Sequence, residues 1–125
     1  MARVDGLDLF TRRIGTGPLV VVLHGDELVL EAHAGRDTEH VRIPVGAGVC
    51  GTAVARKQDQ NVPDVRAVGN YLACNLYTRS ELVVLIRRGD HILGQIDIDS
   101  DVLNGFGERE HADVTAVAEA LAVLL

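Results

Sequence analysis

The sequence has little aromatic content: no tryptophan and only two phenylalanines and two tyrosines among its 125 residues. It also has no long hydrophobic run. The longest apolar stretches, such as residues 19–23 and 82–86, are far too short to span a bilayer, and no charged-then-apolar leader opens the chain. From these absences we expect a cytoplasmic protein with no membrane partner.

A basic surface is missing as well. The 12 lysines and arginines are outnumbered by 18 aspartates and glutamates spread along the chain, which gives a formal charge of −6. Nucleic-acid binding requires a concentrated basic face that neutralises phosphates. We therefore expect no nucleic-acid partner.

Cysteine is scarce, with only Cys50 and Cys74 in the chain. In a reducing compartment two cysteines are typical of separate thiols or a transient redox pair, not of a structural disulfide. They lie 24 residues apart, with no Cys-x-x-Cys motif, and the five histidines include no pair at zinc-binding spacing. The pattern predicts no metal site.

The chain does contain enough apolar residues, 47%, for one domain with a core of its own. The glycines and proline at 15–18 predict a break, with an atypical N-terminal segment at 1–17 and one domain at 18–125. Two β-prone runs, 19–23 and 28–32, flank turn residues and predict a hairpin, followed by a third strand at 41–45.

The second half begins with a short helix and ends with a longer one. Glycine-rich residues 46–51 lead into a short helix at 52–57, and an irregular stretch at 58–79 predicts a long loop over one face of the sheet. Strands at 81–87 and 91–98 form a second hairpin, and the apolar spacing over 108–125 predicts an amphipathic helix. The fold class is α+β: an antiparallel sheet with helices packed on one side.

Two groups of residues are candidates for catalysis. Cys50 lies near a predicted helix N-terminus, where the helix dipole lowers a thiol pKa from its usual value of roughly 8.5. The alternative is that both cysteines are small buried apolar side chains, the usual state of an unpaired cysteine.

The second group is acidic. Strand alternation places Asp97 and Asp99 on one face and the isoleucines that alternate with them, Ile96 and Ile98, on the other. If Glu81 on the neighbouring strand approaches the pair, repulsion raises the pKa of at least one carboxyl and makes it a general acid. The alternative is a solvated strand end.

Residues 28–125 resemble GAF domains and, within them, the free methionine-(R)-sulfoxide reductases. The segments that carry the resemblance are Val41-Arg42-Ile43-Pro44-Val45-Gly46, Gly48-Val49-Cys50-Gly51-Thr52-Ala53, Pro63-Asp64-Val65, Leu72-Ala73-Cys74, Ser80-Glu81 and Asp97-Ile98-Asp99-Ser100. The resemblance implies a GAF-like antiparallel sheet with flanking helices and a long loop over one face.

The resemblance also implies an activity. Cys74 would attack the sulfur of free methionine sulfoxide, while Glu81, Asp97 and Asp99 bind the substrate and supply a proton. No cofactor is implied; thioredoxin or a similar dithiol is the expected reductant, and a homodimer is a further expectation. His40 stands where the family usually has its main resolving cysteine, which leaves Cys50 as the internal resolving thiol.

One feature of that family is absent. A tryptophan and a tyrosine usually line the pocket where this chain has Gly17, Pro18, Leu19 and Val21. The alternative function is therefore a non-catalytic GAF domain that binds a small ligand or reports redox state.

Overall fold

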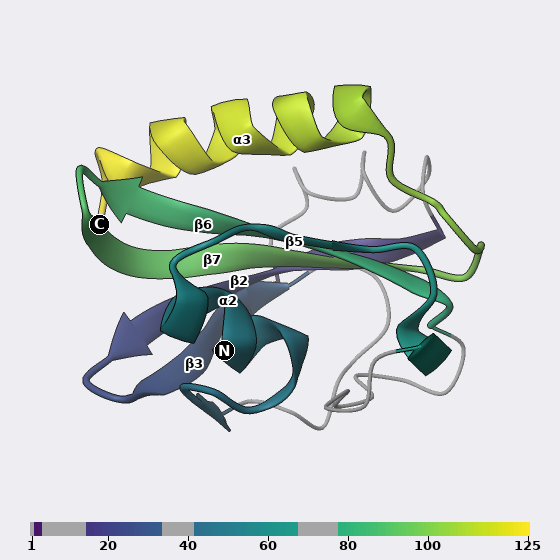
Figure 1. Cartoon of the computed structure of the whole chain (residues 1–125). Helices are drawn as coiled ribbons and strands as arrows, with labels where there is room; N and C mark the ends of the chain where they lie inside the picture. The colour runs from purple at the N-terminus through teal and green to yellow at the C-terminus, as the bar shows by residue number, and fades with distance from the viewer. Residues whose placement is uncertain (1, 4–14, 34–41, 68–77) are drawn as a thin grey trace.

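The computed structural model describes residues 2–3, 15–33, 42–67 and 78–125, which form one curved sheet with a helix on each face (Figure 1). The strand order is β1-β3-β2-β7-β6-β5, and β4 also pairs with β3. The pairs are antiparallel except the short parallel pair β1–β3, so the predicted α+β class is confirmed. The strands are β1 (Ala2–Arg3), β2 (Gly15–His24), β3 (Glu27–His33), β4 (Arg42–Pro44), β5 (Gln60–Val62), β6 (Ser80–Arg88) and β7 (His91–Ser100).

Both predicted hairpins form. β2 and β3 join through a turn in which Gly25 has φ +66°, and β6 and β7 join through one in which Gly89 has φ +59°. L-residues with a side chain rarely adopt these positive values, so glycine at each turn fixes where the chain reverses. β2 also pairs with β7, which places the two hairpins side by side at the centre of the sheet.

The helices lie on opposite faces of the sheet, which corrects the prediction that they pack on one side. On one face α2 (Gly48–Arg56) contributes to a core with Val83 and Leu85; on the other, α3 (Glu108–Ala122) packs on Leu82, Val84 and Ile86. The physical reason is the unbroken apolar run of β6, whose alternate side chains need cover on both faces. Neither of these helices is long and apolar enough to cross a membrane.

The region expected to be one long loop contains a strand that the sequence analysis missed. β5 pairs with β6 from Gln60↔Val83 to Val62↔Glu81, and a 3-10 turn at Val65–Ala67 follows it. The short polar stretch has little β-propensity of its own and becomes a strand because β6 offers it an edge to pair with. Residues 68–77 of the loop predicted over one face lie outside the described residues, so its path there stays a prediction.

Candidate active site

Three carboxyl groups gather on the face of the sheet that α2 covers. In the β6–β7 register Glu81 lies opposite Asp99, and Asp97 is the next residue along β7 on the same face. The side chains are almost fully buried, with exposed fractions of 1% for Glu81, 1% for Asp97 and 5% for Asp99. The predicted carboxylate cluster is therefore present, and the alternative of a solvated strand end is wrong.

Glycines position the first turn of α2 over this cluster. Gly46 and Gly48 have positive φ values of 95° and 63°, and Gly46 donates its N–H to the carbonyl of Gly51 at 2.8 Å. A side chain at Gly51 would overlap the Pro44 carbonyl, so only glycine allows the loop to fold back so closely. Cys50, the third residue of the helix, is carried down onto the sheet as a result.

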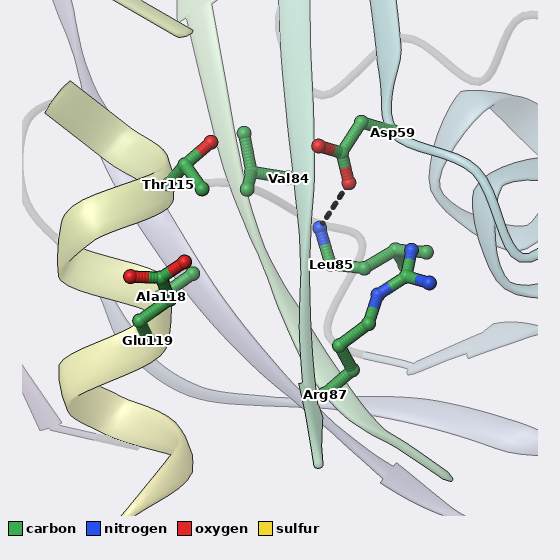
Figure 2. A pocket seen from close by; sticks show the side chains of 7 residues that line it. All are labelled: Asp59, Val84, Leu85, Arg87, Thr115, Ala118 and Glu119. Atoms are coloured by element: carbon green, nitrogen blue, oxygen red, sulfur yellow. Dashed lines mark hydrogen bonds between the residues drawn. The ribbon is translucent and has the colours of Figure 1, made fainter. Parts of the chain in front are cut away.

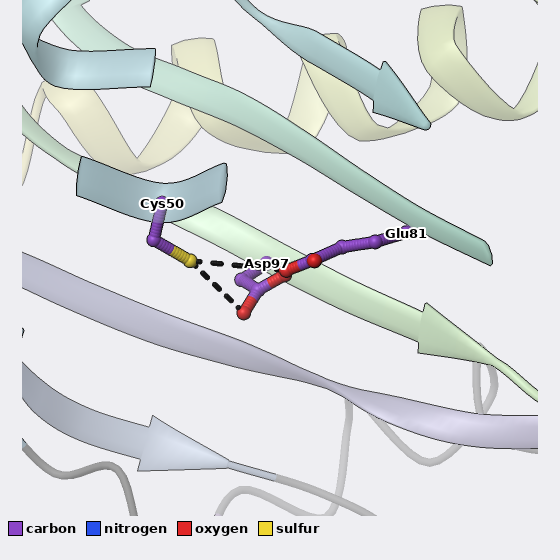
Figure 3. A group of neighbouring side chains, drawn as sticks. All are labelled: Cys50, Glu81 and Asp97. Carbon is purple, nitrogen blue, oxygen red and sulfur yellow. Dashed lines mark hydrogen bonds between the residues drawn. The ribbon is translucent and has the colours of Figure 1, made fainter. Parts of the chain in front are cut away.

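The thiol of Cys50 points between two of the carboxyl groups (Figure 3). Its Sγ lies 3.1 Å from Oδ2 of Asp97 and 3.9 Å from Oε2 of Glu81. Cys50 is 4% exposed, which fits the expectation of a small buried side chain, but its neighbours include acids as well as apolar residues. A thiol that donates to a carboxylate keeps its proton, and this opposes the effect expected from the helix N-terminus.

Glu81 holds a proton more tightly than an ordinary glutamate. Its pKa is raised well above the usual value, first by burial, then by the charges of Asp97 and Asp99 and by a hydrogen bond with Asp97. The contact with Cys50 acts in the opposite direction. The prediction of a carboxyl with a raised pKa is confirmed, although burial contributes more than the repulsion from which it was derived.

The same geometry bears on metal binding. One ligand atom each from Cys50, Glu81 and Asp97 lies within 4.8 Å of the others, close enough for a cation to be shared. Protons shared among buried acidic groups satisfy this spacing equally well, because each proton bridges two electronegative atoms. The absence of a metal stays a prediction.

Several predicted residues cannot be placed. Cys74 and His40 lie outside the described residues, so their positions relative to the cluster stay predictions. The backbone of Leu19, one of the positions where the family resemblance implies an aromatic residue, pairs with Asp97 in the β2–β7 register. Val21, another of these positions, is buried under α2.

Gln95 was not singled out from the sequence. It lies on β7 two residues before Asp97, with no exposed surface, and neither its Oε1 nor its Nε2 has a hydrogen-bond partner among the described residues. A buried amide without a partner costs about 1–3 kcal/mol. The sequence signal for Gln95 was its spacing: residues 95, 97 and 99 alternate along the strand and therefore share one face of the sheet.

A separate open cleft of about 200 Å³ lies between β6 and α3 (Figure 2). It is lined by Asp59, Val84, Leu85, Arg87, Thr115, Ala118 and Glu119. At its rim Asp59 accepts the N–H of Leu85 at 2.8 Å and contacts Nε2 of His111 at 2.8 Å. Val84 and Ala118 belong to the core on the α3 face, so the sheet separates the centre of this cleft from the acidic cluster.

Comparison with known families agrees with this architecture. The profile of the GAF domain matches residues 5–125. The chain belongs to the GAF domain family. In this GAF domain the acidic cluster lies on the sheet face that α2 covers.

Among curated proteins, the chain is 38% identical over 104 residues to the free methionine-R-sulfoxide reductase of Escherichia coli, covering 83% of this chain and 62% of the relative. It is 46% identical over 72 residues to the reductase of the same name from Saccharomyces cerevisiae, covering 57% of this chain and 38% of that protein. The chain thus spans less than two thirds of the length of these relatives.

Two solved structures are also similar. The type II free methionine-R-sulfoxide reductase from Thermoplasma acidophilum is 34% identical, with a TM-score of 0.88 over 95% of this chain and 86% of the other. The free methionine-R-sulfoxide reductase from Neisseria meningitidis, in complex with its substrate, is 30% identical, with a TM-score of 0.85 over 95% of this chain and 72% of that one. The GAF domain therefore resembles these reductases in both sequence and fold.

Proposed function

We propose that this GAF domain reduces free L-methionine-(R)-S-oxide to methionine by thiol chemistry. The observation that carries the proposal is a thiol, Cys50, held 3.1 Å from Asp97 in a buried acidic cluster in which the pKa of Glu81 is raised. Sulfoxide reduction needs these two components, a thiol and a proton donor. The relatives named as free methionine-R-sulfoxide reductases support the same reaction.

The acidic cluster also suits a free amino acid as substrate. Glu81, Asp97 and Asp99 are buried, and buried carboxylates require protons or a cation nearby. The ammonium group of a free amino acid supplies that positive charge, whereas a methionine within a polypeptide has no ammonium group. We infer that these carboxyl groups hold the substrate ammonium.

In the first step the Cys74 thiolate attacks the sulfoxide sulfur. Sulfoxide oxygen leaves poorly until it is protonated, and Glu81, with its raised pKa, is the proton donor. The oxygen then moves from the substrate sulfur to the sulfur of Cys74: the substrate S–O bond and the transient S–S bond break, an S–O bond forms on Cys74 as a sulfenic acid, and methionine departs. The enzyme thiol is oxidised by two electrons and the substrate is reduced by two.

In the second step Cys50 resolves the sulfenic acid. Its proton passes to the acidic cluster, to which Sγ is already hydrogen bonded, and the sulfur attacks the sulfur of Cys74 to form a disulfide. The S–O bond of the sulfenic acid breaks, and the cluster hands the proton on to the departing hydroxide, which leaves as water. The carboxylate that gave a proton in the first step is the acceptor in the second. One cluster therefore serves as acid and then as base.

Thioredoxin or a similar dithiol then reduces the disulfide, as the cytoplasm allows. A homodimer is part of the proposal, supported by the exposed apolar residues Val123 and Leu124 after α3. Cys50, Glu81 and Asp97 come together within one chain.

The test is incubation with the separate R and S epimers of free methionine sulfoxide and dithiothreitol, followed by quantitation of methionine. We expect product from the R epimer alone and none from Cys74→Ser. Absence of R-selective product in the parent protein would eliminate the enzyme. Mass spectrometry after one turnover without added thiol should detect a disulfide between Cys50 and Cys74.

A non-catalytic GAF domain is the second candidate. The observation that favours it is the lack of tryptophan, together with histidine at position 40. Such a domain would bind methionine sulfoxide or another small amino acid in calorimetry and yield no product under the conditions above.

A further inference from the structure

The side chain of Gln95 has polar surroundings in only one direction. Its cross-strand neighbours are Val21 on β2 and Leu85 on β6, and both belong to the apolar core under α2. A register shift after Ile86 makes Ile92, in the same core, the next residue of β7 on this face. Apolar side chains therefore enclose Gln95 on three sides.

The fourth side leads to Asp97. Residues two apart on a strand lie about 6.6–6.8 Å from one another on the same face, a distance that a glutamine side chain can bridge. The carboxyl of Asp97 contacts the Cys50 thiol at 3.1 Å, so the Gln95 amide is the next polar group along β7 from the acidic cluster.

An amide buried in this way calls for a ligand. Both Oε1 and Nε2 lack a partner among the described residues, and an apolar side chain of similar length would remove the cost. Native proteins keep few such groups, and a role in catalysis or binding is one of the recognised reasons for keeping them.

The chemistry of the surroundings selects which part of methionine sulfoxide fits here. An α-carboxylate would be repelled by the neighbouring acids, and the ammonium group finds its counter-charge at the carboxylates. The sulfoxide oxygen is a neutral acceptor that needs only neutral donors. The apolar side chains of Val21, Leu85 and Ile92 on this face suit the methyl group on the same sulfur.

We propose that Gln95 is a specificity-determining residue whose Nε2–H binds the sulfoxide oxygen of the substrate. The inference rests on the proposed function and adds a donor to the site. In this arrangement the oxygen accepts from Gln95 on one lone pair and from the acidic cluster on the other. Methionine, which lacks the oxygen, gains nothing from Gln95.

The test compares Gln95→Met with its parent in a Cys74→Ser background, which blocks turnover. Calorimetry measures the affinity for free methionine-(R)-sulfoxide and for methionine. We expect the affinity for the sulfoxide to fall about tenfold, the scale of one hydrogen bond to a buried donor, and the affinity for methionine to change less than about twofold. The melting temperature should rise, because the unpartnered amide is gone.

Leu85→Met is the matched control, since it changes a neighbouring side chain on the same face without altering its polarity. It should leave the ratio of the two affinities unchanged. Gln95→Leu serves as a second variant if Gln95→Met does not fold. An equal loss for both ligands, or no loss for the sulfoxide, would overturn the role of Gln95.

The two hypotheses fail in different ways. If the Cys74→Ser parent binds no sulfoxide and the unmodified protein yields no methionine, the proposed function fails and this inference with it. If the unmodified protein is R-selective and Gln95→Met retains its preference for the sulfoxide over methionine, only the role of Gln95 is wrong.

Discussion

The Sγ of Cys50 lies 3.1 Å from Oδ2 of Asp97, so the first turn of α2 and the central strand β7 meet through a polar contact beside the apolar core that α2 covers. This contact links the thiol to the proton-carrying cluster. Cys50 has two candidate roles, a buried structural thiol and a resolving thiol. Only the second requires its proton to move, because the proton must leave before the sulfur reacts.

Cys50→Ser should distinguish the resolving thiol from a structural one. Serine keeps a hydrogen donor toward Asp97, so the variant should fold. With dithiothreitol we expect methionine production within about threefold of the parent, because a small thiol can attack a sulfenic acid directly. With thioredoxin as reductant we expect a loss of at least about tenfold, because no internal disulfide can form. If the variant and the parent have equal rates with dithiothreitol and equal rates with thioredoxin, Cys50 is not the resolving thiol.

Glu81→Gln should change how stability depends on pH. Burial and the neighbouring charges raise the pKa of Glu81 in the folded protein. The folded state therefore binds this proton more tightly than the unfolded state, and the associated stability, present below the unfolded pKa, is lost as pH rises through the folded pKa. Glutamine has no proton to lose, so urea unfolding should show the variant gaining on the parent as pH rises. The exposed Glu119→Gln should show no such trend.

Asp99→Asn should move the pH profile of turnover. The charge of Asp99 is one of the causes that raise the pKa of Glu81. Its removal lowers that pKa, so the alkaline limb of kcat against pH should shift to lower pH. Steady-state assays with dithiothreitol at saturating substrate measure this. A limb that stays in place would mean that a group other than Glu81 supplies the proton.

Gly51→Ala should disturb the placement of Cys50. The added methyl would overlap the Pro44 carbonyl, a backbone atom that cannot swing aside. We expect a loss of about 3 kcal/mol in the free energy of unfolding and a larger proportional loss of activity. Gly107→Ala is the control: its methyl would meet only the flexible end of Glu110 at 3.3 Å, so it should cost under about 1 kcal/mol.

Asp59 should matter for stability and not for chemistry. Asp59 directly precedes β5. Its carboxylate accepts the N–H of Leu85, which lies on β6 past the last residue paired with β5, and it contacts His111 on α3. Asp59→Ala leaves the Leu85 N–H without that acceptor and should cost about 1–3 kcal/mol. Asp59→Asn retains an acceptor oxygen and should cost less than Asp59→Ala in chemical denaturation. Both variants should keep R-selective activity in the folded fraction.

Local signals in the sequence were sufficient for much of the fold. Gly25 and Gly89 mark both hairpin turns, and apolar spacing marks α3, which begins at the predicted Glu108 and ends at Ala122. β5 was missed because its pairing depends on the exposed edge of β6, which no local pattern encodes. The placement of helices on both faces was recoverable from β6, whose run of consecutive apolar residues cannot belong to a one-sided sheet.

The site was predictable in its components and less so in its contacts. Alternation placed Asp97 and Asp99 together, and hairpin pairing brought Glu81 beside them. The degree of burial, which contributes most to the raised pKa of Glu81, depends on tertiary packing and not on spacing. Gln95 was overlooked because one glutamine within a strand has no special meaning until its lack of partners is known.

The β6–β7 hairpin is shared by both cores: Val83 and Leu85 contribute to one and Leu82 and Val84 to the other. Neither core can unfold while the other stays folded, because the β6–β7 hairpin is part of both cores. The described part of the chain should therefore melt as a single cooperative unit, with its slowest amide hydrogen exchange in this hairpin. A substitution under α3, remote from the acidic cluster, would then reduce activity by lowering the population of the whole native state.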